Sequence, residues 1–67
     1  MLISHLAALR KANGQTQAQL GEAIGVSRKT INTVENRVFI PSTVLALKLA
    51  RELKVPVEAI FELEDEA

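Results

Sequence analysis

The sequence predicts an all-α protein of five helices, at about 2–12, 16–24, 27–35, 42–53 and 56–62. Two observations support this fold class. Apolar residues recur three and four positions apart along almost the whole chain, which is the period of an amphipathic helix. Residues that begin or end helices also stand between the periodic segments, with Thr16, Ser27, Ser42 and Pro56 before them and Gly14 and Gly25 after them.

The two ends of the chain admit a second interpretation. The spacing of Leu2, Leu6 and Leu9 predicts a helix over 2–12 that stops at Asn13-Gly14, where a left-handed backbone is tolerated. The terminal sequences "MLIS" and "FELE" are also each suited to short strands that pair. Terminal strands therefore remain an alternative to the ends of the first and fifth helices.

The second and third helices are predicted to be joined by about three residues around Gly25. Thr16 and Gln19 form a capping box for the second helix, and Ser27 is a good cap for the third. So short a link forces the two helices to cross steeply, as in a helix-turn-helix. A glycine inside a helix costs about 1 kcal/mol relative to alanine, so Gly21 is best explained by close approach at this crossing. The side chains expected to face inward are Leu20, Ile24, Val26, Ile31 and Val34.

Ser42 is predicted to cap the fourth helix, and Pro56 to open a short fifth one. The apolar side chains of the fourth helix cover much of its circumference, namely Val44, Leu45, Leu47, Leu49, Ala50 and Leu53. Such a helix is typically central to a core.

Length and composition limit the function. A chain of 67 residues is one small domain, 1–67, and buries only about 60% of its unfolded surface, so a partner chain is expected. There is no cysteine or tyrosine, and the one histidine, His5, has no evident nucleophile beside it. We therefore expect no enzyme, no catalytic residue, no metal site and no cofactor. No apolar run reaches the ~18–20 residues that cross a bilayer, so we expect a cytoplasmic protein with no membrane partner.

The formal net charge is zero, but the charges are segregated. Residues 1–54 carry eight basic and three acidic side chains, a net charge of +5, and residues 55–67 carry five acidic side chains and no basic one. Charges more than about 8–10 Å apart are largely screened at physiological salt, so a polyanion would respond to the local field. The total charge therefore does not exclude nucleic acid, while the acidic residues 63–67 are expected to form a frayed tail.

The outward face of the third helix carries side chains that suit the major groove of DNA. Arginine and lysine donate to guanine, asparagine pairs with adenine, and the threonine methyl group contacts thymine. Basic residues in the first turn oppose the helix dipole by about 0.3–1 kcal/mol each, so a surface selected only for stability would rarely place them there. The free N–H groups beside the cap Ser27 also favour a phosphate. The outward residues are Arg28, Lys29, Asn32, Thr33 and Asn36.

The segment "TQAQLGEAIGVSRKTINTVEN" resembles the helix-turn-helix of the lambda-repressor-like family, which includes phage repressor and Cro proteins and the XRE-type regulators of bacteria. The shared features include "TQ" at the start of the second helix, "GVS" at the turn and a hydrophobe–Glu–Asn ending of the third helix. The likeness continues through "PS", "LALKLARELKV" and "AIF" and covers roughly residues 6–62. It implies a five-helix DNA-binding domain.

The resemblance also implies roles for single residues. Base edges would be contacted by Arg28, Lys29, Asn32 and Thr33, and phosphates by Gln17, Ser27, Asn36 and Arg37. Arg10 and Glu35 match the positions of an ion pair between helices. The family commonly has a glycine after Glu-Asn, where this chain has Arg37, so either Asn36 adopts a positive φ or the loop differs.

These observations predict a DNA-binding transcriptional regulator of bacteria or phage, associated with the nucleoid, that acts as a dimeric repressor on an inverted-repeat operator. The dimer interface is predicted from apolar residues in excess of one small core, namely Val55, Val57, Ile60, Phe61 and Leu63. No small-molecule effector is indicated. Two alternatives stay open: the antitoxin of a toxin–antitoxin pair, and a protein-interaction module on the same fold.

Overall fold

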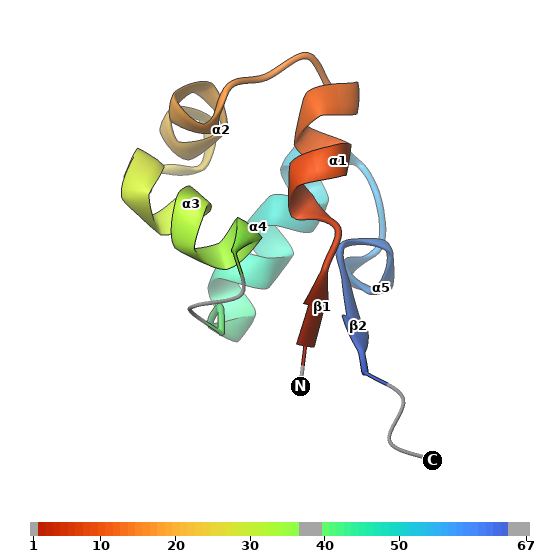
Figure 1. Ribbon diagram of the computed structural model, residues 1–67. Coiled ribbons are helices and arrows are strands. Elements are labelled where there is room, and N and C mark those ends of the chain that lie inside the picture. The colour runs from red at the N-terminus through yellow and green to blue at the C-terminus, as the bar shows by residue number, and fades with distance from the viewer. Residues whose placement is uncertain (1, 37–39, 65–67) are drawn as a thin grey trace.

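The computed structural model describes residues 2–36 and 40–64, and within them the chain forms five α-helices and one two-stranded sheet. Figure 1 shows α2 and α3 together on one side of the molecule, and the two strands near α5 on the other. The helices are α1 (Leu6–Ala12), α2 (Gln17–Ile24), α3 (Arg28–Glu35), α4 (Thr43–Leu53) and α5 (Val57–Ile60), and the strands are β1 (Leu2–Ser4) and β2 (Phe61–Leu63).

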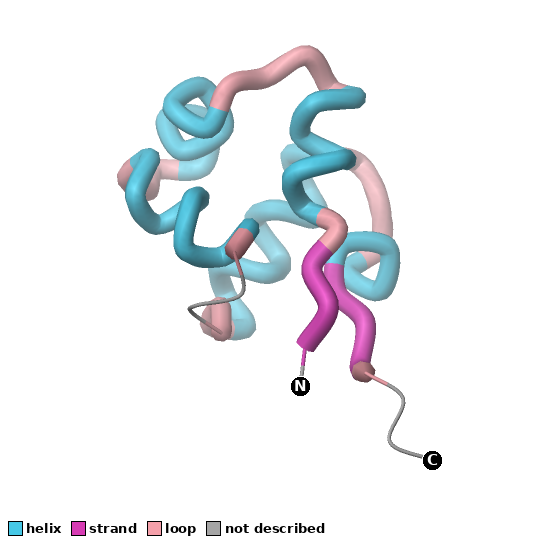
Figure 2. The backbone as a smooth tube through the Cα atoms, viewed as in Figure 1, coloured by secondary structure: helices cyan, strands magenta, loops and turns pink. Residues whose placement is uncertain are grey.

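Residues 2–4 and 61–63 form strands, so the predicted bounds of the first and fifth helices are wrong there. β1 pairs antiparallel with β2, with Leu2 opposite Leu63 and Ser4 opposite Phe61. The two strands run side by side, so segments from opposite ends of the sequence lie together (Figure 2). Pairing with a distant segment overrides the local helical spacing of the leucines. The alternative of short terminal strands is confirmed.

The core lies where the helices meet and includes at least one residue from every helix. Its buried hydrophobic side chains are Leu6, Leu20, Ile24, Ile31, Val34, Leu45, Leu49, Leu53, Ile60 and Phe61. The inward set predicted for α2 and α3 belongs to this core, with Val26 partly buried against it. This packing fixes α3 relative to the rest of the molecule.

The turn between α2 and α3 is held by glycine at two positions. Gly25 ends α2 with a φ of 78°, in the left-handed region that glycine adopts without strain. A Cβ on Gly21 would lie 2.7 Å from the backbone oxygen of Val26. The Val26 N–H in turn donates to the Gly21 carbonyl oxygen at 2.9 Å. The turn therefore folds directly over Gly21, as its position in the sequence predicts.

α4 is buried along one side only, contrary to the expectation of apolar burial over much of its circumference. Leu45, Leu49 and Leu53 are buried, but Val44 and Leu47 are exposed over 63% and 56% of their surfaces. The helix begins at the predicted cap, where the Ser42 hydroxyl oxygen accepts the Leu45 N–H at 3.1 Å.

Candidate nucleic-acid interface

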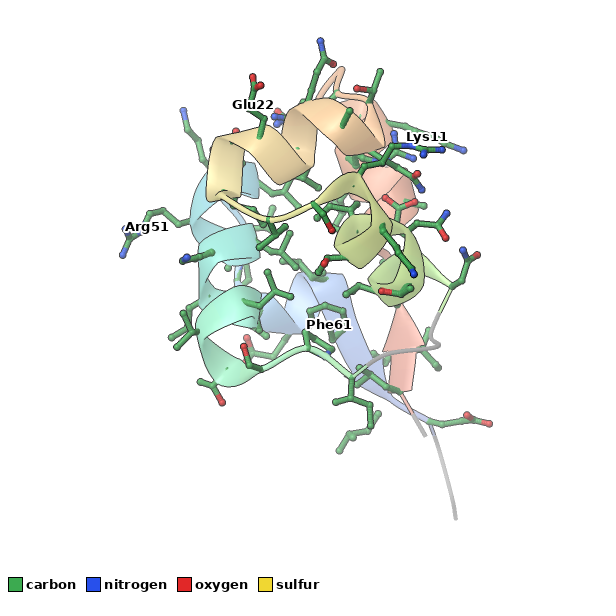
Figure 3. The ribbon with its side chains drawn as sticks, turned by 90° about the vertical axis from the view of Figure 1, so that its left-hand side faces the viewer. Lys11, Glu22, Arg51 and Phe61 are labelled. Carbon is green, nitrogen blue, oxygen red and sulfur yellow. The ribbon has the colours of Figure 1, made fainter. Side chains whose placement is uncertain are left out.

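The polar face of α3 is turned to the outside. Arg28, Lys29 and Asn32 are exposed, whereas Ile31 and Val34 of the same helix are buried in the core. Figure 3 views the side of the molecule on which α2 and α3 lie. The first turn of α3 carries no acidic residue that would neutralise its two basic side chains. Three of the four residues predicted to contact bases therefore lie together on an accessible, donor-rich surface.

Thr33, the fourth predicted base-contacting residue, is only half-buried. Its hydroxyl donates to the Thr30 carbonyl oxygen at 2.9 Å, within α3 itself. The hydroxyl proton is thus used inside the helix, and the methyl group is the part of Thr33 left for contact with a thymine methyl group.

Ser27 caps α3 and is exposed at the turn. Its hydroxyl oxygen accepts the Thr30 N–H at 3.1 Å and lies 3.0 Å from the Thr30 hydroxyl oxygen. Capping satisfies one of the free N–H groups of the first turn, and the remaining ones, with the positive end of the helix dipole, favour an anion close to Ser27.

Gln17 is the first residue of α2, and its side chain is bound within the protein. The Nε2 group donates to Oε1 of Glu35 at 2.9 Å, which joins the start of α2 to the end of α3. The neighbouring capping box is present as predicted, because the Thr16 hydroxyl accepts the Gln19 N–H and the Gln19 side chain accepts the Thr16 N–H. The bond between Gln17 and Glu35 has no signal in the sequence pattern.

Arg10 and Glu35 form the ion pair that the resemblance implies. Arg10 Nε lies 2.6 Å from Glu35 Oε2, and their side chains are only 10% and 6% exposed. Arg10 also donates from Nη1 to the Gln15 carbonyl oxygen at 2.8 Å. The Arg10 guanidinium is therefore hydrogen-bonded within the protein at all three of its nitrogens.

Asn36 ends α3 with an ordinary φ of −90°. The possibility that it adopts a positive φ is therefore wrong. Its side-chain amide donates to the Asn32 carbonyl oxygen at 3.0 Å, and the residue is exposed. Arg37, the other predicted phosphate contact in this loop, lies outside the described residues.

The five residues predicted to form a dimer interface do not make one free surface. Ile60 and Phe61 are buried in the core of the chain itself, because the fifth helix ends early and β2 turns Phe61 inward. Val55 and Val57 are half-buried against the same core. Leu63 is 82% exposed, so it is the member of this set with most of its side chain available to a partner.

A different set of apolar side chains is exposed near the start of α4. Ile40 is 77% exposed and stands close to Val44 and Leu47 in the sequence. Beside them lies an apolar groove of about 300 Å³, lined by Leu2, Ile40, Pro41, Ser42, Thr43, Ala46, Leu47, Val57 and Phe61. The sequence predicts a helix central to the core because the apolar positions of α4 cover much of its circumference, but Val44 and Leu47 remain exposed.

Neither a metal site nor a membrane-spanning helix is found in the part of the chain that the structure describes. No group of histidine, cysteine, aspartate or glutamate side chains in residues 2–36 and 40–64 is arranged to hold a metal ion. None of the helices described here is long and apolar enough to cross a membrane.

Comparison with known proteins identifies the family. A helix-turn-helix family model matches residues 6–60. The HTH-type transcriptional regulator YgzD of Bacillus subtilis, itself uncharacterized, is 40% identical over 58 residues, which cover 87% of this chain and 88% of that protein. An uncharacterized HTH-type transcriptional regulator of Methanothermobacter thermautotrophicus is 41% identical over 58 residues, 85% of this chain and 84% of that protein.

A solved structure shares the fold. The crystal structure of a candidate DNA-binding protein from Bacteroides fragilis superposes with a TM-score of 0.83 and covers 92% of this chain and 100% of that one, at 22% sequence identity. The arrangement of α2, the Gly25 turn and α3, the match over residues 6–60 and the related regulators agree with the resemblance seen in the sequence. The chain belongs to the helix-turn-helix family, of XRE type.

Proposed function

We propose that the protein is a transcriptional regulator that binds double-stranded DNA sequence-specifically by placing α3 in the major groove. The observation that carries this proposal is the exposed face of α3, on which Arg28, Lys29 and Asn32 lie together above a buried apolar face. Such side chains read guanine and adenine edges, and the first turn of a recognition helix is the part that usually meets them. The related HTH-type transcriptional regulators support the same function.

The phosphate contacts of the proposed complex come from the start of α2 and from both ends of α3. The free N–H groups at the start of α3, next to Ser27, would meet one phosphate, and Gln17 at the start of α2 would meet another. Asn36 at the end of α3 is exposed and available for a third. Thr33 would contact a base through its methyl group.

We further propose that two copies act together as a repressor. One module of this size buries about 600–1,000 Å² on DNA, which is small for tight specific binding, so a second copy is expected to contribute. A two-fold dimer would present two α3 helices to successive major grooves about 34 Å apart and would read an inverted repeat. The exposed apolar side chains Ile40, Val44, Leu47 and Leu63 supply a surface for the second copy. Occupation of promoter DNA by such a dimer in the cytoplasm is the simplest route to repression.

Selection of bound sequences from random duplex DNA, followed by salt titration on the selected site, tests the proposal. We expect an inverted-repeat consensus and a steep fall of log K with log salt, because each neutralised phosphate releases counterions. If no sequence is enriched even at low salt, DNA reading by α3 is refuted. Enrichment of a single half-site without symmetry would leave DNA binding intact and refute the dimer.

A further inference from the structure

The Glu35 carboxylate joins three helices at one buried point. Oε2 accepts from Arg10 Nε at 2.6 Å. Oε1 accepts from Arg10 Nη2 at 3.3 Å and from Gln17 Nε2 at 2.9 Å. Both carboxylate oxygens are therefore occupied, on a side chain that is 6% exposed. Arg10 comes from α1, Gln17 from α2 and Glu35 from α3.

The bond from Gln17 is not needed to bury the ion pair. Arg10 already occupies both oxygens of Glu35, and its own remaining contact is to the Gln15 carbonyl. The Gln17 side chain is half-buried at the surface, so water would satisfy its amide if Glu35 were absent. The contact is therefore best explained by its effect on the orientation of the Gln17 side-chain amide.

A carboxylate can only accept hydrogen bonds, so it selects which end of the Gln17 amide turns inward. One of the two N–H bonds of Nε2 is held by Glu35, and the other N–H of the same group stays free for an acceptor outside the protein. A free glutamine side chain samples many rotamers and presents its carbonyl oxygen as often as its NH₂ group. A phosphate accepts an N–H and is repelled by the carbonyl oxygen.

We propose that the Arg10–Glu35 pair positions Gln17 for a DNA phosphate. Arg10 holds the Glu35 carboxylate, Glu35 fixes the donor end of the Gln17 amide, and the second N–H of Gln17 meets the phosphate beside the start of α2. This proposal rests on the proposed DNA-binding function. Glu35 and Arg10 are positioning residues, because they act through Gln17 and do not touch DNA.

The test removes the carboxylate while keeping the fold and the net charge. The double variant Arg10→Met/Glu35→Leu replaces a buried pair with apolar side chains of similar size, which is often neutral or stabilising. It removes one positive and one negative charge, so the long-range attraction to DNA is unchanged. Thermal unfolding of each variant is followed in parallel, and affinity is measured for the selected operator and for an unrelated duplex.

We expect the double variant to bind both duplexes about 3–10-fold more weakly. Without Glu35, the Gln17 side chain would lose its conformational freedom only on binding DNA, and this entropy loss lowers the affinity. Gln17→Ala should weaken wild-type binding by a similar factor and have little further effect in the double variant. Gln15→Ala is the matched control, since the Gln15 side chain donates a hydrogen bond to Glu52 at 3.1 Å, away from α3, and its loss leaves the net charge unchanged. Its DNA affinity should equal that of the wild type.

A purely structural ion pair predicts a different result. The double variant would then bind like the wild type while folded, or Gln17→Ala would lose the same factor in both backgrounds, and either result overturns the proposal. If the double variant does not fold, NMR on the wild-type chain decides. The Gln17 side-chain NH₂ group should remain hydrogen-bonded to Glu35, and its proton resonances should change in chemical shift when operator is added. Loss of that bond in the complex would also overturn the proposal. A wild-type chain that binds no DNA would instead refute the proposed function.

Discussion

At the scale of single residues, Gly21 has no room for a side chain, because the turn between α2 and α3 lies directly against it. We predict that Gly21→Ala destabilises the protein by about 1–3 kcal/mol, although alanine is the better helix former by ~1 kcal/mol. The added methyl group would meet the Val26 oxygen at 2.7 Å, and this oxygen belongs to a turn that is itself hydrogen-bonded to Gly21. Urea unfolding measures the change.

Glu22 provides the control for this substitution. It is exposed beside Gly21 and points away from the molecule in Figure 3. Glu22→Ala should change the free energy of unfolding by no more than about 0.5 kcal/mol. A Gly21→Ala protein as stable as the wild type would contradict the close approach of turn and helix.

Lys54 is a residue at which the backbone is strained. It follows α4 with a φ of 59°, in the left-handed region where a side chain is unfavourable. We predict that Lys54→Gly stabilises the protein by about 0.5–1 kcal/mol, after allowance for the greater freedom of glycine in the unfolded chain. Lys48→Gly, within α4, should instead destabilise it by about 1 kcal/mol. Thermal unfolding of the two variants should show changes in stability of opposite sign. A loss of stability in Lys54→Gly would contradict the interpretation that the backbone at Lys54 is strained.

At the scale of elements, the basic residues in the first turn of α3 lower the stability of the free protein and are proposed to bind DNA. Arg28→Ala should stabilise the free protein by about 0.3–1 kcal/mol, because it removes a positive charge from the positive end of the helix dipole. It should also weaken operator binding by about 1–3 kcal/mol and relax the preference at one base pair. Unfolding and titration of the same preparation measure both changes.

Lys48→Ala is the matched control for Arg28→Ala. It removes the same charge from α4 and not from α3, so base preference should stay unchanged. If Arg28→Ala and Lys48→Ala weakened all sequences equally, Arg28 would act only through general charge attraction.

Local chemistry in the sequence was enough to predict the central elements. The caps at Thr16, Ser27 and Ser42 and the stop at Gly25 each depend on a few neighbouring residues, and all four are found in the structure. Interactions between distant segments were harder to predict. Neither the bond from Gln17 to Glu35 nor the strained conformation of Lys54 leaves a periodic signal.

The terminal strands and the exposed apolar residues were also hard to predict from local sequence. Helical spacing at Leu2 and Leu6 competes with strand pairing to a segment at the opposite end of the chain, and only the folded structure decides between them. Apolar residues on α4 likewise do not reveal which of them face outward. Ile60 and Phe61 were predicted to face a partner and instead complete the core of their own chain.

At the scale of the whole molecule, the exposed apolar side chains near the start of α4 are the surface we propose for the second copy. We predict that Leu47→Glu yields a monomer with nearly unchanged monomer stability, because this side chain is already 56% exposed. Operator affinity should fall, and binding should no longer depend on both halves of the inverted repeat. Analytical ultracentrifugation and binding to half-site duplexes measure the two effects.

Ala23→Glu adds the same charge at an exposed position of α2, beside a different hollow lined by Lys48 and Arg51, and should leave the dimer intact. A Leu47→Glu protein that remains dimeric would place the interface elsewhere.

The pairing of β1 with β2 has a consequence for the order of folding. This sheet closes a loop through almost the entire chain, and such closures are entropically unfavourable until the segments between them have condensed. The helices α2, α3 and α4 can form their contacts first, so we expect the termini to dock last and to open first. Native-state hydrogen exchange should therefore find the amides of Leu2–Ser4 and Phe61–Leu63 exchanging faster than those of Leu20 and Leu49. The terminal strands would then open and close while the reading helix stays folded.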